Sequence, residues 1–216
     1  MAKQVTIDDA AALVKDGMTV MIGGFMGCGS PHKIIDKLVE RGVKDLTLIC
    51  NDAGFPDFGV GKMVMKKQFK KIYASHIGLN PEAGRQMNEQ ETEVVLIPQG
   101  TLAERIRCAG AGIGGFLTPT GVGTLVQEGK EVINIDGRDY LLELPLHADI
   151  AIVEASRADR MGNLQYHGST RNFGELMVTA ADTVIAEVRE VVEVGEIDQD
   201  YVHTPGIFID YIAGGN

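Results

Sequence analysis

The sequence contains no tryptophan, and aromatic residues make up only 6% of its 216 residues. The interior must therefore be built from Ile, Val, Leu and Met. Cysteine is also scarce. The three cysteines lie far apart and form no Cys-x-x-Cys pair: Cys28, Cys50 and Cys108. A sparse and odd count of this kind indicates a reducing compartment and argues against a disulfide framework.

Long apolar runs are missing as well. No run approaches the ~18 residues that a membrane-spanning helix needs, and residues 1–11 contain no apolar core of a signal peptide. We therefore expect a cytoplasmic protein with no membrane segment. Basic residues are outnumbered, 20 against 30 acidic ones, which gives a net charge of −10. Because a protein that grips duplex nucleic acid usually carries a basic stripe, no nucleic-acid partner is expected.

Glycine is the residue in excess, with 27 copies. No collagen-like period accompanies them, so these glycines must serve turns and close approaches of the backbone. The remaining composition, 44% apolar and 23% charged, is ordinary for a globular protein. A chain of this length fills one compact domain, and we expect residues 1–216 to form it.

Short apolar runs alternate with amphipathic stretches along the chain. Helices are expected over residues 6–15, 30–42, 59–67, from 80 onward, 101–109 and 172–181. Strands are expected over residues 18–22, 46–50, 71–74, 93–97, 149–154, 183–187 and 207–212. The alternation predicts an α/β domain with a central, mostly parallel sheet that is flanked by helices on both faces.

Local signals refine this pattern at three places. Ser30-Pro31 offers a capping hydroxyl followed by a proline in the first helical turn. Thr101 and Glu104 have the spacing of a capping box, which predicts that a helix opens there. Asp136-Gly137 separates two apolar runs within residues 132–143, which is typical of a β-hairpin, so a small antiparallel excursion should leave the main sheet.

A first glycine cluster lies between a predicted strand and a predicted helix. Its members are Gly23, Gly24, Phe25, Met26, Gly27, Cys28 and Gly29. Open α/β sheets bind ligands at such junctions, and backbone N–H groups ahead of a helix N-terminus suit a phosphate or an oxyanion. The spacing is neither G-x-G-x-x-G nor a P-loop. The alternative is a tight turn that binds nothing.

Three further loops are candidates for function. Residues 108–124 hold six glycines together with Ile, Phe and Leu, and a loop of this length without structure of its own is uncommon unless functional. Residues 51–54 and 98–101 each follow a predicted strand, so with the first cluster they should converge on one edge of the sheet and frame a pocket. Ordinary turn chemistry is the alternative for both.

The histidines are scattered and show no metal-ligand spacing, so no metal site is expected. They are His32, His76, His147, His167 and His203.

Residues 16–31, with the first glycine cluster at their centre, resemble the first signature of the family I coenzyme A transferases. The resemblance extends over nearly the whole chain, through residues 51–54, 98–107, 108–124, 158–163 and 169–173. It is closest to the α subunits of short-chain members, which move CoA between acetoacetate and acetate or butyrate. Coenzyme A or acyl-CoA would then be a substrate, and no covalently bound cofactor is implied.

The resemblance implies a ping-pong reaction through a glutamyl-CoA thioester. In the family the nucleophilic glutamate lies in a Ser-Glu-Asn-Gly type motif on the β subunit, and no glutamate of this chain is followed by Asn. The chain should therefore be half of an enzyme, in a heterotetramer or hetero-octamer, with no catalytic nucleophile of its own. By resemblance, Gly23 to Gly29 bind CoA, and Asn51 and Gln99 support the reaction. Asp52 stands where relatives have a second Asn.

Two other functions belong to the same fold. A ligand-binding sensor domain would be expected to carry a DNA-binding extension, and no such extension is recognisable. A sugar-phosphate isomerase would need its own acid–base pair, and none can be placed in the sequence.

Overall fold

The computed structural model describes residues 2–215. Its main sheet has the strand order β1-β12-β11-β9-β2-β3-β4-β5, with β10 paired to β9 outside this path. Every pair along the path is parallel, and β10 pairs antiparallel. The strands are β1 (Lys3–Val5), β2 (Thr19–Ile22), β3 (Leu46–Ile49), β4 (Phe69–Ala74), β5 (Glu93–Leu96), β9 (Ala148–Asp159), β10 (Leu164–Gln165), β11 (Ala181–Val192) and β12 (Tyr211–Gly214). The predicted parallel sheet is confirmed.

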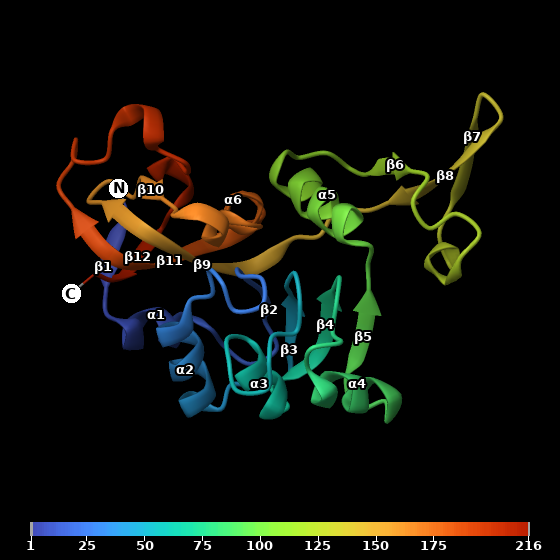
Figure 1. The fold of residues 1–216 in the computed structure, drawn as a ribbon, viewed down its shortest axis with the longest axis horizontal. Coiled ribbons are helices and arrows are strands. Elements are labelled where there is room, and N and C mark those ends of the chain that lie inside the picture. The colour runs from blue at the N-terminus through green and yellow to red at the C-terminus, as the bar shows by residue number, and fades with distance from the viewer. Residues whose placement is uncertain (1, 216) are drawn as a thin grey trace.

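Helices cover both faces of this sheet, as the alternating pattern predicted (Figure 1). On one face lie α1 (Ile7–Leu13), α2 (His32–Arg41), α3 (Gly61–Met65) and α4 (Pro81–Asn88). On the other lie α5 (Gln99–Gly110) and α6 (Gly174–Met177). Each face has its own apolar cluster, and both are built mainly from aliphatic side chains. The two clusters share one sheet and belong to a single α/β domain.

Helix α2 shows how the apolar pattern becomes packing. Ile34, Ile35 and Leu38 recur at helical spacing and are fully buried against the sheet. Burial of each such side chain contributes about 1.5–3 kcal/mol to stability. The helix ends at Gly42, whose φ of 63° lies in the left-handed region that glycine adopts without strain.

The start of α2 differs from the prediction. Pro31 occupies the capping position and makes no side-chain hydrogen bond, so Ser30 is not the cap. The carboxylate of Glu187 on β11 accepts the N–H groups of Lys33 at 3.1 Å and Ile34 at 2.8 Å instead. A residue far away in sequence therefore accepts the backbone N–H groups of the first helical turn, and no local signal in the sequence could have indicated this.

Helix α5 also begins earlier than predicted. Its first residue is Gln99, with Pro98 at the capping position. Thr101 therefore lies inside the first turn and is buried, so the predicted capping box from Thr101 to Glu104 is wrong. Pro98 sets the helix start, because a proline disfavours helical backbone at the residue before it.

Two predicted elements near the C-terminus are wrong in extent. The helix expected over residues 172–181 is reduced to the four residues of α6, because β11 begins at Ala181 and pairs with β9 from that residue. The strand expected over 207–212 is a 3₁₀ turn at Gly206–Phe208 followed by β12. Ile207 is 88% exposed, whereas Ile209 and Ile212 of the same stretch are buried in the core.

The predicted hairpin is confirmed and projects from the main sheet (Figure 1). Strands β7 (Val132–Ile135) and β8 (Arg138–Glu143) pair antiparallel around Asp136 and Gly137, whose φ values are 50° and 79°. Residues 108–124 are not without structure of their own, since β6 (Phe116–Thr118) within them pairs with the other side of β8. No helix within residues 2–215 is both long and apolar enough to cross a membrane.

The Glu187 cap makes stability depend on pH. Burial is the main cause that raises the pKa of this carboxyl above its ordinary value of 4.5, and the nearby Glu154 adds to the rise. A carboxyl with a raised folded-state pKa stabilises the fold most below its unfolded pKa, and it loses that contribution as pH rises through the folded pKa. We expect the free energy of unfolding of the native chain, relative to Glu187→Gln, to fall as pH rises from about 4.5.

Urea unfolding of the native chain and of Glu187→Gln across that pH range checks this expectation. A difference in their free energies of unfolding that stays constant with pH would contradict it. Glu187→Ala, which leaves both N–H groups of α2 without their acceptor, should lose about 1–3 kcal/mol at neutral pH.

Candidate functional site

The order of the strands reverses between β2 and β9. From β2 the chain builds outward through β3, β4 and β5, and it then returns to build β9, β11 and β12 on the other side. In open α/β sheets, ligands bind outside the carboxyl ends of the strands at such a reversal. The first glycine cluster leaves β2 at this point, where the Gly23 N–H donates to the Ile152 carbonyl of β9 at 2.9 Å.

The centre of that cluster is a tight turn formed by residues 25–28, here called the Phe25–Cys28 turn. Phe25 and Cys28 exchange both backbone hydrogen bonds, at 3.0 and 2.9 Å. Met26 and Gly27 at its tip have φ values of 51° and 80°. Two consecutive residues with positive φ identify a type I′ turn. The ring Nε2 of His32 donates to the Gly27 carbonyl at 3.0 Å and braces the turn from α2.

Two glycines of the cluster are required by contacts within the chain. A Cβ added at Gly27 would lie 2.1 Å from the ring of Phe58. A Cβ at Gly29 would lie 2.4 Å from the carbonyl oxygen of Thr170. Both approaches are far below van der Waals contact, so a side chain at either position would force its neighbour to move, whether or not a ligand is present.

The first turn of α2 is not open to an anion in the way that the sequence suggested. Its N–H groups at Lys33 and Ile34 already donate to Glu187. A phosphate at this place would have to displace a buried carboxylate of the same charge. A cavity of about 620 Å³ opens here, lined by Gly27, Gly29 and Lys33 among others, and a ligand in it would meet the Glu187 carboxylate and not free N–H groups of the helix terminus.

The predicted convergence of three loops is confirmed by direct hydrogen bonds. Gln99 Nε2 donates to Asn51 Oδ1 at 2.9 Å, which joins the start of α5 to the loop after β3. The backbone N–H of Met26 donates to Asp52 Oδ2 at 2.7 Å, which joins that loop to the Phe25–Cys28 turn. The loops after β2, β3 and β5 thus form one connected edge.

A cavity of about 330 Å³ opens beside this edge, here called the amide pocket. Asn51 and Gln99 line it together with Phe25, Cys28, Ser169, Asn172 and Phe173. The Asn51 Oδ1 atom accepts from Gln99 and also from the Ser75 hydroxyl at 3.1 Å. Because its oxygen is engaged, the N–H₂ end of the Asn51 amide is available to a ligand as a hydrogen-bond donor.

A second cavity, of about 370 Å³, is lined by Met26, His76 and Leu79 among others. We call it the Leu79 pocket. Phe25 and Gln99 line both pockets, and Phe25 is 38% exposed. The position of the Phe25–Cys28 turn therefore decides the shape of both pockets.

Three residues of the amide pocket were not predicted individually from the sequence, although the segment 169–173 that contains them was part of the resemblance. They are Ser169, Asn172 and Phe173. The Asn172 side chain donates to the Cys28 carbonyl at 3.1 Å, and the Ser169 hydroxyl lies 3.5 Å from Cys28 Sγ. Phe173 supplies an apolar wall. The clustered polar residues after β10 were the available signal, but nothing local indicated that they fold back onto the first glycine cluster.

The other sequence candidates lie elsewhere. Residues 116–118 and Thr120, from the glycine-rich segment 108–124, line a separate cavity of about 280 Å³ between α5 and β6. Within residues 2–215, no three His, Cys, Asp or Glu side chains gather as potential metal ligands.

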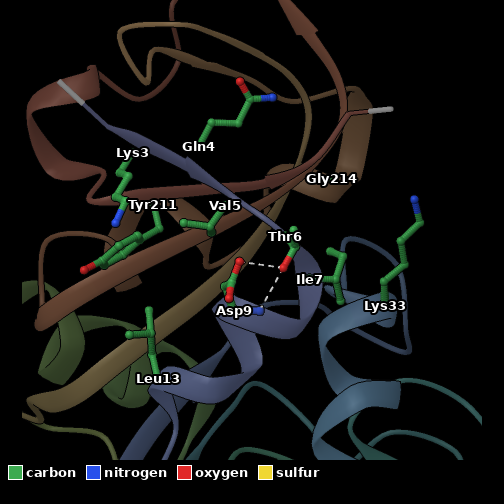
Figure 2. A pocket seen from close by; sticks show the side chains of 10 residues that line it. All are labelled: Lys3, Gln4, Val5, Thr6, Ile7, Asp9, Leu13, Lys33, Tyr211 and Gly214. Carbon is green, nitrogen blue, oxygen red and sulfur yellow. Dashed lines mark hydrogen bonds between the residues drawn. The ribbon is translucent and has the colours of Figure 1, made fainter.

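A wide cavity of about 850 Å³ lies at the far end of the sheet, beside β1 and the start of α1 (Figure 2). Its wall includes Thr6, whose hydroxyl caps α1 by accepting the N–H of Asp9 at 3.0 Å, and none of the predicted site residues.

A family model described as coenzyme A transferase matches residues 4–215. The chain belongs to the coenzyme A transferase family. It is 53% identical over 210 residues to the acetate CoA-transferase subunit alpha of Escherichia coli K12, covering 97% of this chain and 96% of that protein. It is 48% identical to the acetoacetyl-CoA:acetate/butyrate CoA transferase alpha subunit of Clostridium acetobutylicum, covering 98% and 97%.

Among solved structures, the chain resembles an acyl-CoA transferase from E. coli O157:H7 in a thioester complex with CoA. The TM-score is 0.89 at 19% identity, over 99% of this chain and 47% of that one. This likeness shows the fold, and the chain spans about half the length of that protein. Both curated relatives are named as subunits of CoA transferases, so they give no support to the sensor or isomerase alternatives.

The contact between Gly27 and Phe58 generates a prediction on stability. Gly27→Ala should cost about 1–2 kcal/mol for the left-handed backbone and about 1–3 kcal/mol more for the overpacking against Phe58. Gly137→Ala is a matched control, because Gly137 has a φ of 79° at the same place in a type I′ turn and nothing within 4 Å of an added Cβ. Thermal melts should show the larger loss at Gly27. Equal losses would mean that the packing against Phe58 is loose.

Proposed function

We propose that this chain is the α subunit of a heteromeric short-chain acyl-CoA:carboxylate CoA-transferase, with residues 1–216 as its α-subunit domain. Acetoacetate, with acetate or butyrate, is the proposed set of acids, and CoA is carried as substrate. The observation that carries the proposal is the Asn51–Gln99 amide pair, hydrogen-bonded at 2.9 Å in a pocket at the strand-order reversal. The names of relatives at 53% and 48% identity support it.

The proposed reaction has two half-reactions that share one nucleophile. A glutamate carboxylate of the β subunit attacks the carbonyl carbon of the acyl-CoA thioester, and the tetrahedral oxyanion collapses to an acyl-glutamyl anhydride and CoA thiolate. The thiolate then attacks the glutamyl carbonyl, which releases the first carboxylic acid and leaves a glutamyl-CoA thioester. The second acid reverses these steps, so that the glutamate is regenerated.

In this proposal Asn51 and Gln99 supply what the reaction needs from the α subunit. Each tetrahedral intermediate places negative charge on an oxygen, and fixed N–H donors stabilise that charge without reorganising. The Asn51 N–H₂ end is oriented by the bonds that its oxygen accepts from Gln99 and Ser75. Residues 23–29 are the proposed contact for CoA, through the Phe25–Cys28 turn.

The nucleotide end of CoA is assigned to the partner. CoA is a polyanion, this chain carries a net charge of −10, and the N-terminus of α2 is occupied by Glu187. Basic residues that hold the phosphates therefore belong on the β subunit. A heterotetramer or hetero-octamer is the proposed assembly, located in the cytoplasm.

Removing the pocket amide should slow the chemistry. In the assembled enzyme, Gln99→Ala is expected to lower kcat by up to about a hundredfold, the scale for the loss of one oxyanion donor, because the Asn51 amide loses the hydrogen bond that orients its N–H₂ group. Assembly, measured by size-exclusion chromatography, should be unchanged. Gln199→Ala, at an exposed glutamine, is the control. Unchanged steady-state kinetics for both substrates in Gln99→Ala would make Gln99 a purely structural residue.

The half-enzyme proposal predicts that the parts are inactive when separate. This chain purified alone should transfer no CoA from acetoacetyl-CoA to acetate, and mixing it with the β subunit should restore transfer. Calorimetry should show weak acyl-CoA binding to the isolated chain. Transfer by the isolated chain would overturn the assignment of the nucleophile to the partner.

A further inference from the structure

Asp52 lies in the loop after β3, three positions beyond Ile49, and is only 3% exposed. Both of its carboxylate oxygens accept backbone N–H groups. Oδ2 accepts from Met26 at 2.7 Å, and Oδ1 accepts from Gly54 at 2.6 Å. The first bond crosses to the Phe25–Cys28 turn, and the second closes a local turn after β3. One buried side chain thus ties two neighbouring strand-end loops together.

Met26 needs such a support. It has a φ of 51°, in the left-handed region, which costs a residue with a side chain about 1–2 kcal/mol. Asn-Gly and Asp-Gly are the favoured sequences of a type I′ turn, and Met-Gly is not. A charge-assisted hydrogen bond to the Met26 N–H offsets that cost at the residue where it arises.

We propose that Asp52 is a positioning residue for the transfer reaction: its carboxylate fixes the Phe25–Cys28 turn and so positions Phe25, which lines both the amide pocket and the Leu79 pocket. The inference rests on the proposed function for its kinetic part only, because the link from Asp52 to the turn is a property of this chain. Asp52 lines neither pocket, so it acts through Met26 and Phe25 and not on the substrate.

A carboxylate is better suited to this task than an amide. Each oxygen of Asp52 serves one N–H group, whereas an Asn side chain has one oxygen and an N–H₂ group that cannot accept. Asp52→Asn must therefore lose one of the two bonds. Asp52→Ala loses both, so its effect should be the larger.

Amide exchange tests the structural link without any assay of activity. In the full chain labelled with ¹⁵N-methionine, the Met26 N–H should exchange more than tenfold faster in Asp52→Ala than in the native chain. Asp149→Ala is the matched control, since Asp149 Oδ2 accepts the Thr19 N–H, also at 2.7 Å, at the opposite end of the sheet. It should leave exchange at Met26 unchanged. An unchanged Met26 rate in Asp52→Ala would overturn the proposal.

A double-mutant cycle in the assembled enzyme tests whether the link matters for transfer. Asp52→Ala should lower kcat/KM about tenfold or more, because a small misplacement of a pocket wall is costly. In a Met26→Asn background the turn becomes Asn-Gly, which adopts type I′ geometry without help. The effect of Asp52→Ala should shrink to about twofold there, as expected for two residues that act through one structure.

The outcomes separate this proposal from the proposed function. If Asp52→Ala costs the same in both backgrounds, Asp52 acts directly on the substrate and the positioning role is wrong. If Met26 exchange accelerates but kcat/KM stays at the native value, the turn is held by Asp52 but does not shape the reacting pockets, which also overturns the proposal. If the assembled native enzyme transfers no CoA, the proposed function fails, and the exchange result still decides whether Asp52 holds the turn.

Discussion

The dipeptide Asn51-Asp52 joins the parts of the site through two hydrogen bonds that point in opposite directions. Asp52 reaches the Met26 N–H in the loop after β2, and Asn51 accepts from Gln99 at the start of α5. Parallel strands release their loops at the same edge, but nothing in the sheet ladder itself orders those loops. These two bonds, with the packing of Phe58 against Gly27, join the loops that form the pocket walls and so help to fix the shape of the two cavities that Phe25 lines.

This arrangement suits a subunit that supplies a prepared environment and no nucleophile. The Asn51 oxygen is committed to Gln99 and Ser75, so the amide nitrogen is directed before any ligand arrives. Glu187 closes the N-terminus of α2, and Phe58 and Thr170 fill the space behind Gly27 and Gly29. The glycine cluster is thus braced from behind. Electrostatic stabilisation of an oxyanion depends on donors that do not move during the reaction, and these contacts provide that rigidity.

The sequence predicted the parallel sheet, the helices on both faces, the hairpin at Asp136-Gly137 and the convergence of the loops after β2, β3 and β5. Each follows from local periodicity or from the geometry of parallel strands. The errors share a different cause. Glu187 accepts the N–H of Ile34 in the first turn of α2 from 153 positions away. Helix α6 is short because the residues from Ala181 onward pair with β9 as strand β11. In the sequence, Asp52 indicates only a turn, and its hydrogen bond with the Met26 N–H depends on the fold. Long-range pairing decides such details, and local signals do not contain it.

The central claim is that this chain shapes the pocket while a glutamate of the partner carries the CoA. The most direct test is to incubate the assembled enzyme with acetoacetyl-CoA, reduce it with borohydride and locate the modified residue by peptide mass spectrometry. A glutamyl-CoA thioester is reduced to an alcohol, which marks the residue permanently. The account predicts the mark on a glutamate of the partner subunit, with none on this chain. A reduced glutamate on this chain would contradict it.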